Sequence, residues 1–218
     1  MLANAVLVAG ATGLIGRELV SQSLEAGLQV HALVRTVPPM PTPRAGLHWL
    51  TIDYRTLPVL PKAIEAHCAL GTTIKVAGSQ QAFRAVDFDA VLHFARACRA
   101  SGVQRFAVVS ALGADARSSN FYSRVKGEME AAISGLGFDS LVIVRPSMLS
   151  GDRASLGQPS RVGEKLVLAA ATPLKPFIPK AWRPIHAATV ARAMRAALRQ
   201  ARPGVHVINS GELQRLGS

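Results

Sequence analysis

Residues 6–16 read VLVAGATGLIG, and this stretch decides the fold. Its apolar start predicts a buried strand, and a helical pattern begins at Leu14, directly after the turn. In that turn Gly10 permits the tight bend, Gly13 lets the backbone approach a pyrophosphate, and Gly16 allows close packing of helix on strand. The first N–H groups of the helix and its dipole favour phosphate. We therefore expect a dinucleotide to contact Gly10, Ala11, Thr12, Gly13, Leu14, Ile15 and Gly16; a glycine-rich turn without a ligand is the alternative.

The second predicted strand, residues 29–34, ends at Arg35 with no acidic residue nearby. An acid at this point would accept a hydrogen bond from the ribose of NAD, whereas a guanidinium can pair with the 2′-phosphate of NADP. Arg17 could add a second positive group, although both could be ordinary surface arginines. We expect NADP(H) to be preferred over NAD(H), and Asp53 and Tyr54, after the third strand, to meet the adenine.

Short apolar runs alternate with longer stretches of helical periodicity along the chain. Strand-like runs occur at residues 5–9, 29–34, 47–52, 67–70, 106–110, 141–144 and 205–208, and helical patterns at 14–26, 80–100, 121–136 and 187–200. Within the second helix, Phe83, Val86, Ala90, Val91, Phe94 and Cys98 form one apolar stripe, and Asn120 is placed to cap the third helix.

This alternation predicts an α/β protein with a Rossmann-type doubly wound parallel sheet and right-handed crossovers. The 218 residues fit a single domain, and 49% hydrophobic residues suffice for a large core. We expect residues 1–218 to form one NAD(P)-binding domain, in which roughly residues 150–204 contribute a small substrate-side segment. Residues 37–43 are Pro-rich and predict a surface loop, and no apolar run approaches the length of a membrane span.

The net charge of +12 comes from arginines that are scattered along the sequence. Arg192, Arg195 and Arg199 have helical spacing, which we interpret as one solvated face; a site for anionic ligands is the alternative. The chain has no zinc-finger spacing and no aromatic–basic RNA motif, so we expect neither a nucleic-acid partner nor a metal. Cys68 and Cys98 lie in apolar surroundings, which predicts free thiols packed in the core and a reducing, cytoplasmic location.

A second group of residues suggests catalysis. Ser110 ends the fifth predicted strand, and Tyr122 and Lys126 lie four residues apart, on one face of the helix that follows. A phenol is a poor acid or base at neutral pH until a nearby cation stabilises its phenolate. We expect Ser110 to hydrogen-bond the substrate oxygen, Tyr122 to transfer the proton, and Lys126 to hold the nicotinamide ribose. The alternative is an ordinary helix with a solvated lysine.

With GATGLIG, Ser110, YSRVK and the Arg145-Pro146-Ser147 segment, the chain resembles the extended or atypical short-chain dehydrogenase/reductases. CALGTTIKVAG at residues 68–78, Val86-Asp87 and SALGADARSSNFYSRVKGEMEAAI are similar to the HIV Tat-interacting-protein-like NADP-binding oxidoreductases. The similarity is specific between about residues 4 and 153 and faint afterwards.

The resemblance implies cofactor contacts beyond the glycine turn. Leu70, Gly71, Thr72 and Thr73 would line the cofactor after the fourth strand, and Pro146, Ser147 and Met148 would approach the nicotinamide. Other reductases commonly carry Asn-Asn-Ala-Gly where this chain has Leu-Gly-Thr-Thr, which puts an Asn-mediated proton relay in doubt.

Two functions are consistent with this sequence. The first is an NADP-dependent oxidoreductase acting on a small carbonyl or alcohol, as a monomer or homodimer. The second is an NADP(H)-binding regulatory or sensor protein with little turnover. The serine, tyrosine and lysine favour the enzyme, whereas the short C-terminal region leaves little protein for a substrate pocket.

Overall fold

The structure, a computed structural model, describes residues 4–37, 44–150, 182–200 and 202–218. Its elements follow one another as β1 (Ala5–Ala9), α1 (Leu14–Glu25), β2 (Gln29–Val34), β3 (Leu47–Thr51), β4 (Glu65–Cys68), α2 (Ile74–Ala77), α3 (Gln80–Arg84), η1 (Ala85–Ala90), α4 (Val91–Ala100), β5 (Arg105–Val109), α5 (Phe121–Ser134), β6 (Ser140–Arg145), β7 (Leu149–Ser150), β8 (Ile185–His186), α7 (Ala187–Gln200), β9 (Gly204–Asn209) and α8 (Ser210–Leu216). The Pro-rich loop predicted at residues 37–43 lies almost wholly outside the described residues.

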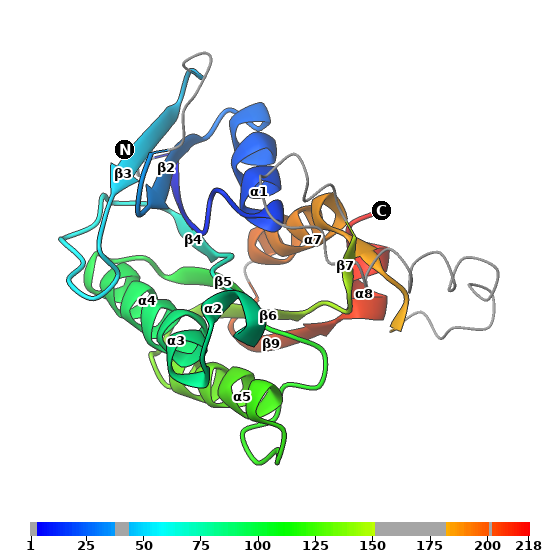
Figure 1. The fold of residues 1–218 in the computed structure, drawn as a ribbon. Helices are drawn as coiled ribbons and strands as arrows, with labels where there is room; N and C mark the ends of the chain where they lie inside the picture. The colour runs from blue at the N-terminus through cyan, green and yellow to red at the C-terminus, as the bar shows by residue number, and fades with distance from the viewer. Residues whose placement is uncertain (1–3, 38–43, 151–181, 201) are drawn as a thin grey trace.

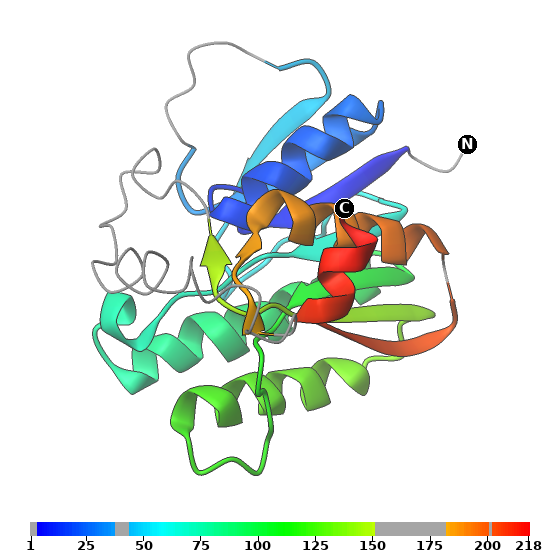
Figure 2. The same cartoon turned by 90° about the vertical axis from the view of Figure 1, so that its right-hand side faces the viewer.

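Seven parallel strands form the main sheet, in the order β3-β2-β1-β4-β5-β6-β9. Helices α1 and α7 cover one face, and α4 and α5 cover the other (Figure 1). The turned view separates these two helical layers on either side of the strands (Figure 2). The predicted Rossmann-type α/β fold is confirmed.

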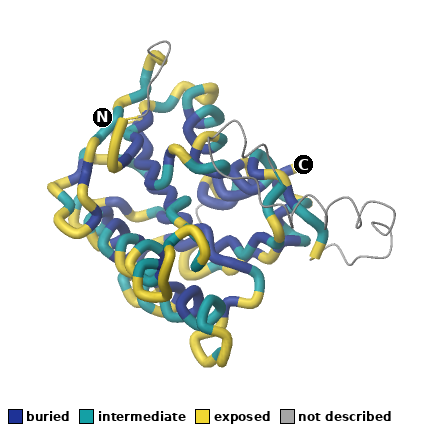
Figure 3. Tube along the Cα trace, viewed as in Figure 1, coloured by how far each residue is buried: buried dark blue, intermediate teal, exposed yellow. Residues whose placement is uncertain are grey.

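The side chains of β1 show why the sheet needs helices on both faces. Val6 and Val8 pack toward α1 and α7, whereas Leu7 and Ala9 pack toward α4 and α5. All five residues of the strand are buried, and the burial view shows such buried segments in the centre of the molecule (Figure 3). A strand covered on both faces reads as a continuous apolar run, as this one does.

The helix predicted at residues 80–100 is present as α3, η1 and α4, and η1 is a π-helical turn. A π turn shifts the phase of the side chains that follow it. The buried positions are Phe83, Asp87, Val91, Leu92, Phe94, Ala95 and Cys98, whereas Val86 and Ala90 are only half-buried. Ala90 nevertheless packs against the core, so the predicted stripe was wrong at Val86 and omitted Asp87. The predicted cap of α5 is confirmed, because the Asn120 side chain accepts a hydrogen bond from the backbone N–H of Ser123.

The face of α7 predicted to be solvated was wrong at Arg195, whereas Arg192 and Arg199 are exposed. Arg195 is 7% exposed because α7 packs on the sheet beside α1, and it interacts electrostatically with the buried Glu65 of β4. The Nε of Arg192 donates a hydrogen bond to the Gly217 carbonyl. Of the substrate-side segment expected at roughly 150–204, residues 151–181 lie outside the described residues. In its described part, α7 packs in the core, and β9, which follows the segment, extends the sheet as the strand predicted at residues 205–208.

Candidate cofactor and active site

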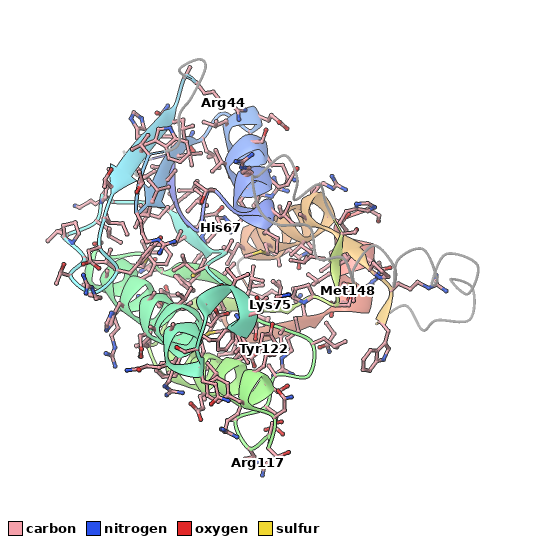
Figure 4. All side chains as sticks on the ribbon, in the orientation of Figure 1. Arg44, His67, Lys75, Arg117, Tyr122 and Met148 are labelled. Atoms are coloured by element: carbon pink, nitrogen blue, oxygen red, sulfur yellow. The ribbon has the colours of Figure 1, made fainter. Side chains whose placement is uncertain are left out.

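The predicted site residues gather at the carboxyl ends of the strands. The chain runs outward from β1 to β2 and β3 and then returns to place β4 on the other side of β1. In doubly wound sheets, ligands bind at such a reversal of strand order. Figure 4 labels Lys75, Tyr122 and Met148 near the middle of its view, and Arg44 and Arg117 at opposite outer ends of the molecule.

The glycines of the first turn are fixed by different constraints. Gly10 has a φ of 76°, and a Cβ there would lie 2.5 Å from the carbonyl oxygen of Ala69, in the loop after β4. A Cβ on Gly16 would lie 2.0 Å from the carbonyl oxygen of Gly10. Around Gly13, the nearest atom to an added Cβ is 3.4 Å away, an ordinary contact. Protein packing therefore requires Gly10 and Gly16, and Gly13 leaves open backbone that a pyrophosphate can approach.

The N-terminus of α1 fits an anionic ligand. No side chain caps this helix, and its first turn contains no acidic residue. The first N–H groups of a helix need a partner, and a phosphate can provide one. Ala11 and Ile15 are buried in the core, so only their backbone is available, whereas Thr12 is exposed.

The residues proposed to contact the adenosine part of the cofactor differ in their exposure and in their hydrogen-bond partners. Arg35 is exposed directly after β2, and its guanidinium has no hydrogen bond or ion pair within the part of the chain that the structure describes. By contrast, the Asp53 carboxylate is 2.7 Å from Arg55, whose hydrogen bonds lower the pKa of Asp53 to about 2. Tyr54 is buried and donates a hydrogen bond to the Leu33 carbonyl. Arg17 donates to the Thr12 carbonyl beside the glycine turn.

The loop after β4 contacts both the glycine turn and the proposed catalytic lysine. Its start at Ala69 and Leu70 packs against Gly10. Further on, the backbone N–H of Thr72 donates to the Asp87 carboxylate at 2.8 Å, and the Thr73 hydroxyl caps α2. A Cβ on Gly71 would lie 3.8 Å from the Lys126 ammonium nitrogen. The structure therefore brings Gly71 and Thr72 close to the proposed catalytic lysine.

Ser110, Tyr122 and Lys126 lie on the elements that the sequence predicts. Ser110 follows β5 directly and is 4% exposed, and its hydroxyl has no hydrogen-bond partner among the described residues. An unpartnered buried hydroxyl is costly unless a ligand satisfies it. Tyr122 is half-buried in the first turn of α5, with its ring centroid 5.3 Å from that of Phe83. Lys126, one helical turn further, is 3% exposed and interacts electrostatically with Tyr122.

Asp87 is the site residue for which the sequence reasoning assigned no role. Its carboxylate lies 2.7 Å from the Lys126 ammonium, and its side chain is 1% exposed. Burial alone would lower the pKa of Lys126, but the charge of Asp87 raises it above the ordinary value, so Lys126 remains protonated. The spacing of Asp87 from Phe83 and Val91, both buried on the same helical face, is the sequence signal that could have revealed it.

The segment after β6 is tied to the C-terminal elements. Ser147 donates a hydrogen bond to the Arg183 carbonyl and accepts one from the Ser210 hydroxyl. Pro146 is buried and Met148 is 38% exposed. The Ser147 hydroxyl therefore already has hydrogen-bond partners within the protein. Of Pro146, Ser147 and Met148, only Met148 has an exposed side chain.

Comparison with known proteins gives the family. The NAD(P)H-binding family matches residues 10–201. The chain belongs to this family. A mitochondrial FMP52 protein from Coccidioides immitis is 30% identical over 96% of this chain and 95% of its own length. Rat HTATIP2 protein is 38% identical over 67% of this chain, a match that spans 59% of the rat protein.

Solved structures agree on the fold. MoeE5 in complex with UDP-glucose and NAD superposes with a TM-score of 0.72 at 19% identity, covering 96% of this chain and 79% of that one. Human epimerase family protein SDR39U1 with NADPH superposes with a TM-score of 0.66 at 18% identity, covering 95% of this chain and 77% of that one. The chain is an atypical short-chain dehydrogenase/reductase similar to HTATIP2, as the resemblance implied.

The predicted cytoplasmic location was wrong. The fungal relatives, from Scheffersomyces stipitis, Emericella nidulans and Candida albicans among others, are named mitochondrial proteins. The prediction rested on Cys68 and Cys98, which are free and fully buried. A free cysteine in the core behaves as a small apolar side chain. Its presence therefore does not distinguish one reducing compartment from another.

No helix in the described parts of the chain is long and apolar enough to cross a membrane. Within the same residues, no group of three or more His, Cys, Asp or Glu side chains could hold a metal ion.

Proposed function

We propose that this protein is an NADP(H)-dependent oxidoreductase acting on a small carbonyl or alcohol. The observation that carries the proposal is the buried, charged Lys126 one helical turn from Tyr122, at the edge of the sheet where doubly wound folds bind dinucleotides. Burying an ammonium carries a desolvation penalty, so a buried, charged lysine needs a functional reason. Positioning the Tyr122 phenol for proton transfer provides one.

The preference for NADP(H) is supported by Arg35. Arg35 follows β2 directly, and its guanidinium forms no hydrogen bond or ion pair among the described residues. Asp53, the acid that follows β3, is paired with Arg55. Pairing between a guanidinium and a phosphate is directional and charge-assisted. We infer that Arg35 binds the 2′-phosphate and that the N-terminus of α1 binds the pyrophosphate.

In the reductive direction, the residues of this chain handle the proton and the developing charge. NADPH, when bound, supplies a hydride for the carbonyl carbon. The Ser110 hydroxyl donates a hydrogen bond to the carbonyl oxygen, and the Oη–H bond of Tyr122 breaks as that oxygen gains its proton. Lys126 stabilises the phenolate that remains until solvent returns a proton to it, and also holds the nicotinamide ribose.

Substitution of Tyr122 tests this function. With NADPH and a panel of small aldehydes and ketones, Tyr122→Phe should reduce kcat about a hundredfold or more, while calorimetry detects unchanged NADPH binding. Ser134→Ala is the control, because it also removes one hydroxyl from α5, at the opposite end of the helix, where Ser134 donates a hydrogen bond to the Glu130 carbonyl. Its turnover should remain at the wild-type level. Equal activity of the Tyr122→Phe and wild-type proteins would contradict the assignment.

The second candidate is a regulatory NADP(H)-binding protein. The ion pair between Lys126 and Asp87 favours it in one respect, because the ammonium is satisfied without a substrate. Tight NADPH binding without turnover on any carbonyl would support this candidate. Turnover that depends on Tyr122 would exclude it.

A further inference from the structure

Strand β9 is one edge of the main sheet, and its outer side has an unpaired backbone within the described residues. At its start, the Gly204 N–H donates to the Asp139 carbonyl, on the side of β6. The backbone groups of successive residues in a strand point to opposite sides, so those of Val205 and Val207 point away from β6. Neither valine has a hydrogen bond on this outer side among the described residues. Both therefore present a free N–H and a free C=O at the edge.

The same two valines also expose apolar side chains. Val205 is 48% and Val207 is 41% exposed, although Ile143, the β6 neighbour of Val207, is buried beneath the helices of that face. A cavity of about 320 Å³, lined by both valines and by Ala131 of α5, lies between β9 and that helix. Figure 1 shows β9 beside β6, at the end of the sheet next to α5. β9 thus combines an open backbone edge with an exposed apolar face.

The opposite edge of the sheet differs in this respect. The exposed residues of β3 are His48 and Thr51, whose polar side chains suit contact with water. Natural proteins usually protect an edge strand with a charged side chain, a proline or a bulge, because an open edge pairs with other strands. The sequence of β9, GVHVIN, contains neither a charged residue nor a proline. Its pairing with β6 is continuous from Gly204 to Asn209, so it has no bulge either.

Charge indicates which partner fits this edge. The chain has a net charge of +12, so a polyanion or an acidic protein would bind where basic side chains are exposed, and β9 has none. An uncharged, apolar strand edge is the matching partner, and β9 itself is such a strand. Two copies can meet antiparallel about a twofold axis at His206, with Val205 of one copy opposite Val207 of the other. Each such pair exchanges two N–H···O bonds, so this register satisfies every outward backbone group of both valines.

We propose that β9 is an interface at which two copies of this chain form an isologous dimer, joining their sheets into one. The contact pairs the exposed valines across the twofold axis and reduces their exposure to water. This inference goes beyond the proposed function and does not depend on it, because association is measured without nucleotide or substrate.

Sedimentation equilibrium of the full chain measures this association directly. At about 100 µM protein the wild type should have twice the mass of one chain, because small interfaces without strong anchors bind in the micromolar range. Added salt should strengthen the dimer, since salt screens the repulsion between two chains that each carry a charge of +12. A wild type that stays monomeric at this concentration, or a dimer that salt dissociates, would overturn the proposal.

A lysine substitution tests whether β9 is the contact. Val207→Lys should weaken the association about tenfold or more, because it removes apolar contact and places an ammonium group in the strand interface. Val59→Lys is the matched control, because Val59 is 93% exposed in the connection between β3 and β4 and the change in net charge is equal. The control should dimerise as the wild type does. Equal weakening by both variants would indicate a general charge effect and overturn the proposal.

A mixing experiment tests both the register and the identity of the partner. In the proposed dimer, position 207 of one copy faces position 205 of the other, so a mixture of Val207→Lys and Val205→Glu places an ammonium opposite a carboxylate. The mixture should associate about tenfold more tightly than either variant alone. A mixture of Val207→Lys and Val59→Glu should show no such gain.

Thermal unfolding checks that the variants are folded before they are mixed. If either variant fails to fold, Val205→Lys with Val207→Glu supplies the same pair with its charges exchanged. Folded variants that associate no better when mixed than alone would overturn the proposal, as would an equal gain in the Val59→Glu mixture.

Discussion

A Cβ placed on Gly16 would lie 2.0 Å from the carbonyl oxygen of Gly10, so α1 and the preceding turn meet backbone to backbone. Neither the oxygen nor the helix can move without disturbing the contact between Gly10 and the loop after β4. Gly13, between them, has no such restriction. These three glycines therefore have separable roles in packing and in ligand approach.

Alanine substitution should separate these roles. Gly16→Ala should destabilise the protein by about 3 kcal/mol, because overpacking against backbone allows little relaxation. Gly13→Ala should leave the fold nearly unchanged and weaken NADPH binding at least tenfold, because the added methyl occupies the open side of the turn. Thermal unfolding and calorimetry measure the two effects. A stable Gly16→Ala protein, or a Gly13→Ala protein that binds normally, would contradict these assignments.

Arg35→Asp should weaken NADPH binding about tenfold to a hundredfold and leave NADH binding nearly unchanged. A hydrogen bond to a charged group contributes about 1.5–3 kcal/mol, and only NADPH carries the 2′-phosphate that Arg35 would bind. Calorimetry with both nucleotides measures the difference. Arg96→Asp is the control, because Arg96 is exposed on α4 and the substitution changes net charge equally. Equal losses for the two nucleotides would show that Arg35 does not recognise the phosphate.

The sequence predicts the fold well where structure depends on local pattern. The glycine turn, the strand at Ala5–Ala9, the helix at Ala187–Gln200 and the Asn120 cap all follow from neighbouring residues, and the structure has each of them. The fourth strand was predicted to begin at His67 and begins at Glu65. Glu65 concealed its start, because a buried carboxylate interrupts the apolar pattern by which a buried strand is predicted.

The site was less predictable because its contacts join distant parts of the chain. The sequence indicates Ser110, Tyr122 and Lys126 by spacing, but the pairing of Lys126 with Asp87 depends on how η1 packs against α5. The spacing of Asp87 from Phe83 and Val91 could have indicated its inward position, but spacing does not identify the lysine with which it pairs. Likewise, Asp53 has the expected position after β3, but its pairing with Arg55 depends on the conformation of the turn.

Glu65 should make the protein less stable in acid. It is 3% exposed, with one oxygen 3.2 Å from His67 Nε2 and the other 3.7 Å from Arg105. Although burial raises the pKa of Glu65, its partners lower it below the ordinary 4.5. A carboxyl whose folded pKa is depressed stabilises the fold above its unfolded pKa, and this stability is lost as pH falls through the folded value. Urea unfolding should therefore show stability declining below about pH 4.5.

Glu65→Gln should cost about 3 kcal/mol at pH 7 and flatten this acid decline, because the variant removes the buried carboxylate that His67 and Arg105 contact. The decline flattens because glutamine has no proton to bind in that pH range. Glu212→Gln provides the comparison, since Glu212 forms an exposed pair with Arg215 on α8. Exposed pairs contribute less than about 1 kcal/mol, so this variant should keep the wild-type acid profile. If Glu65→Gln retained the wild-type slope between pH 4.5 and the acid unfolding region, Glu65 would not be the group that titrates there.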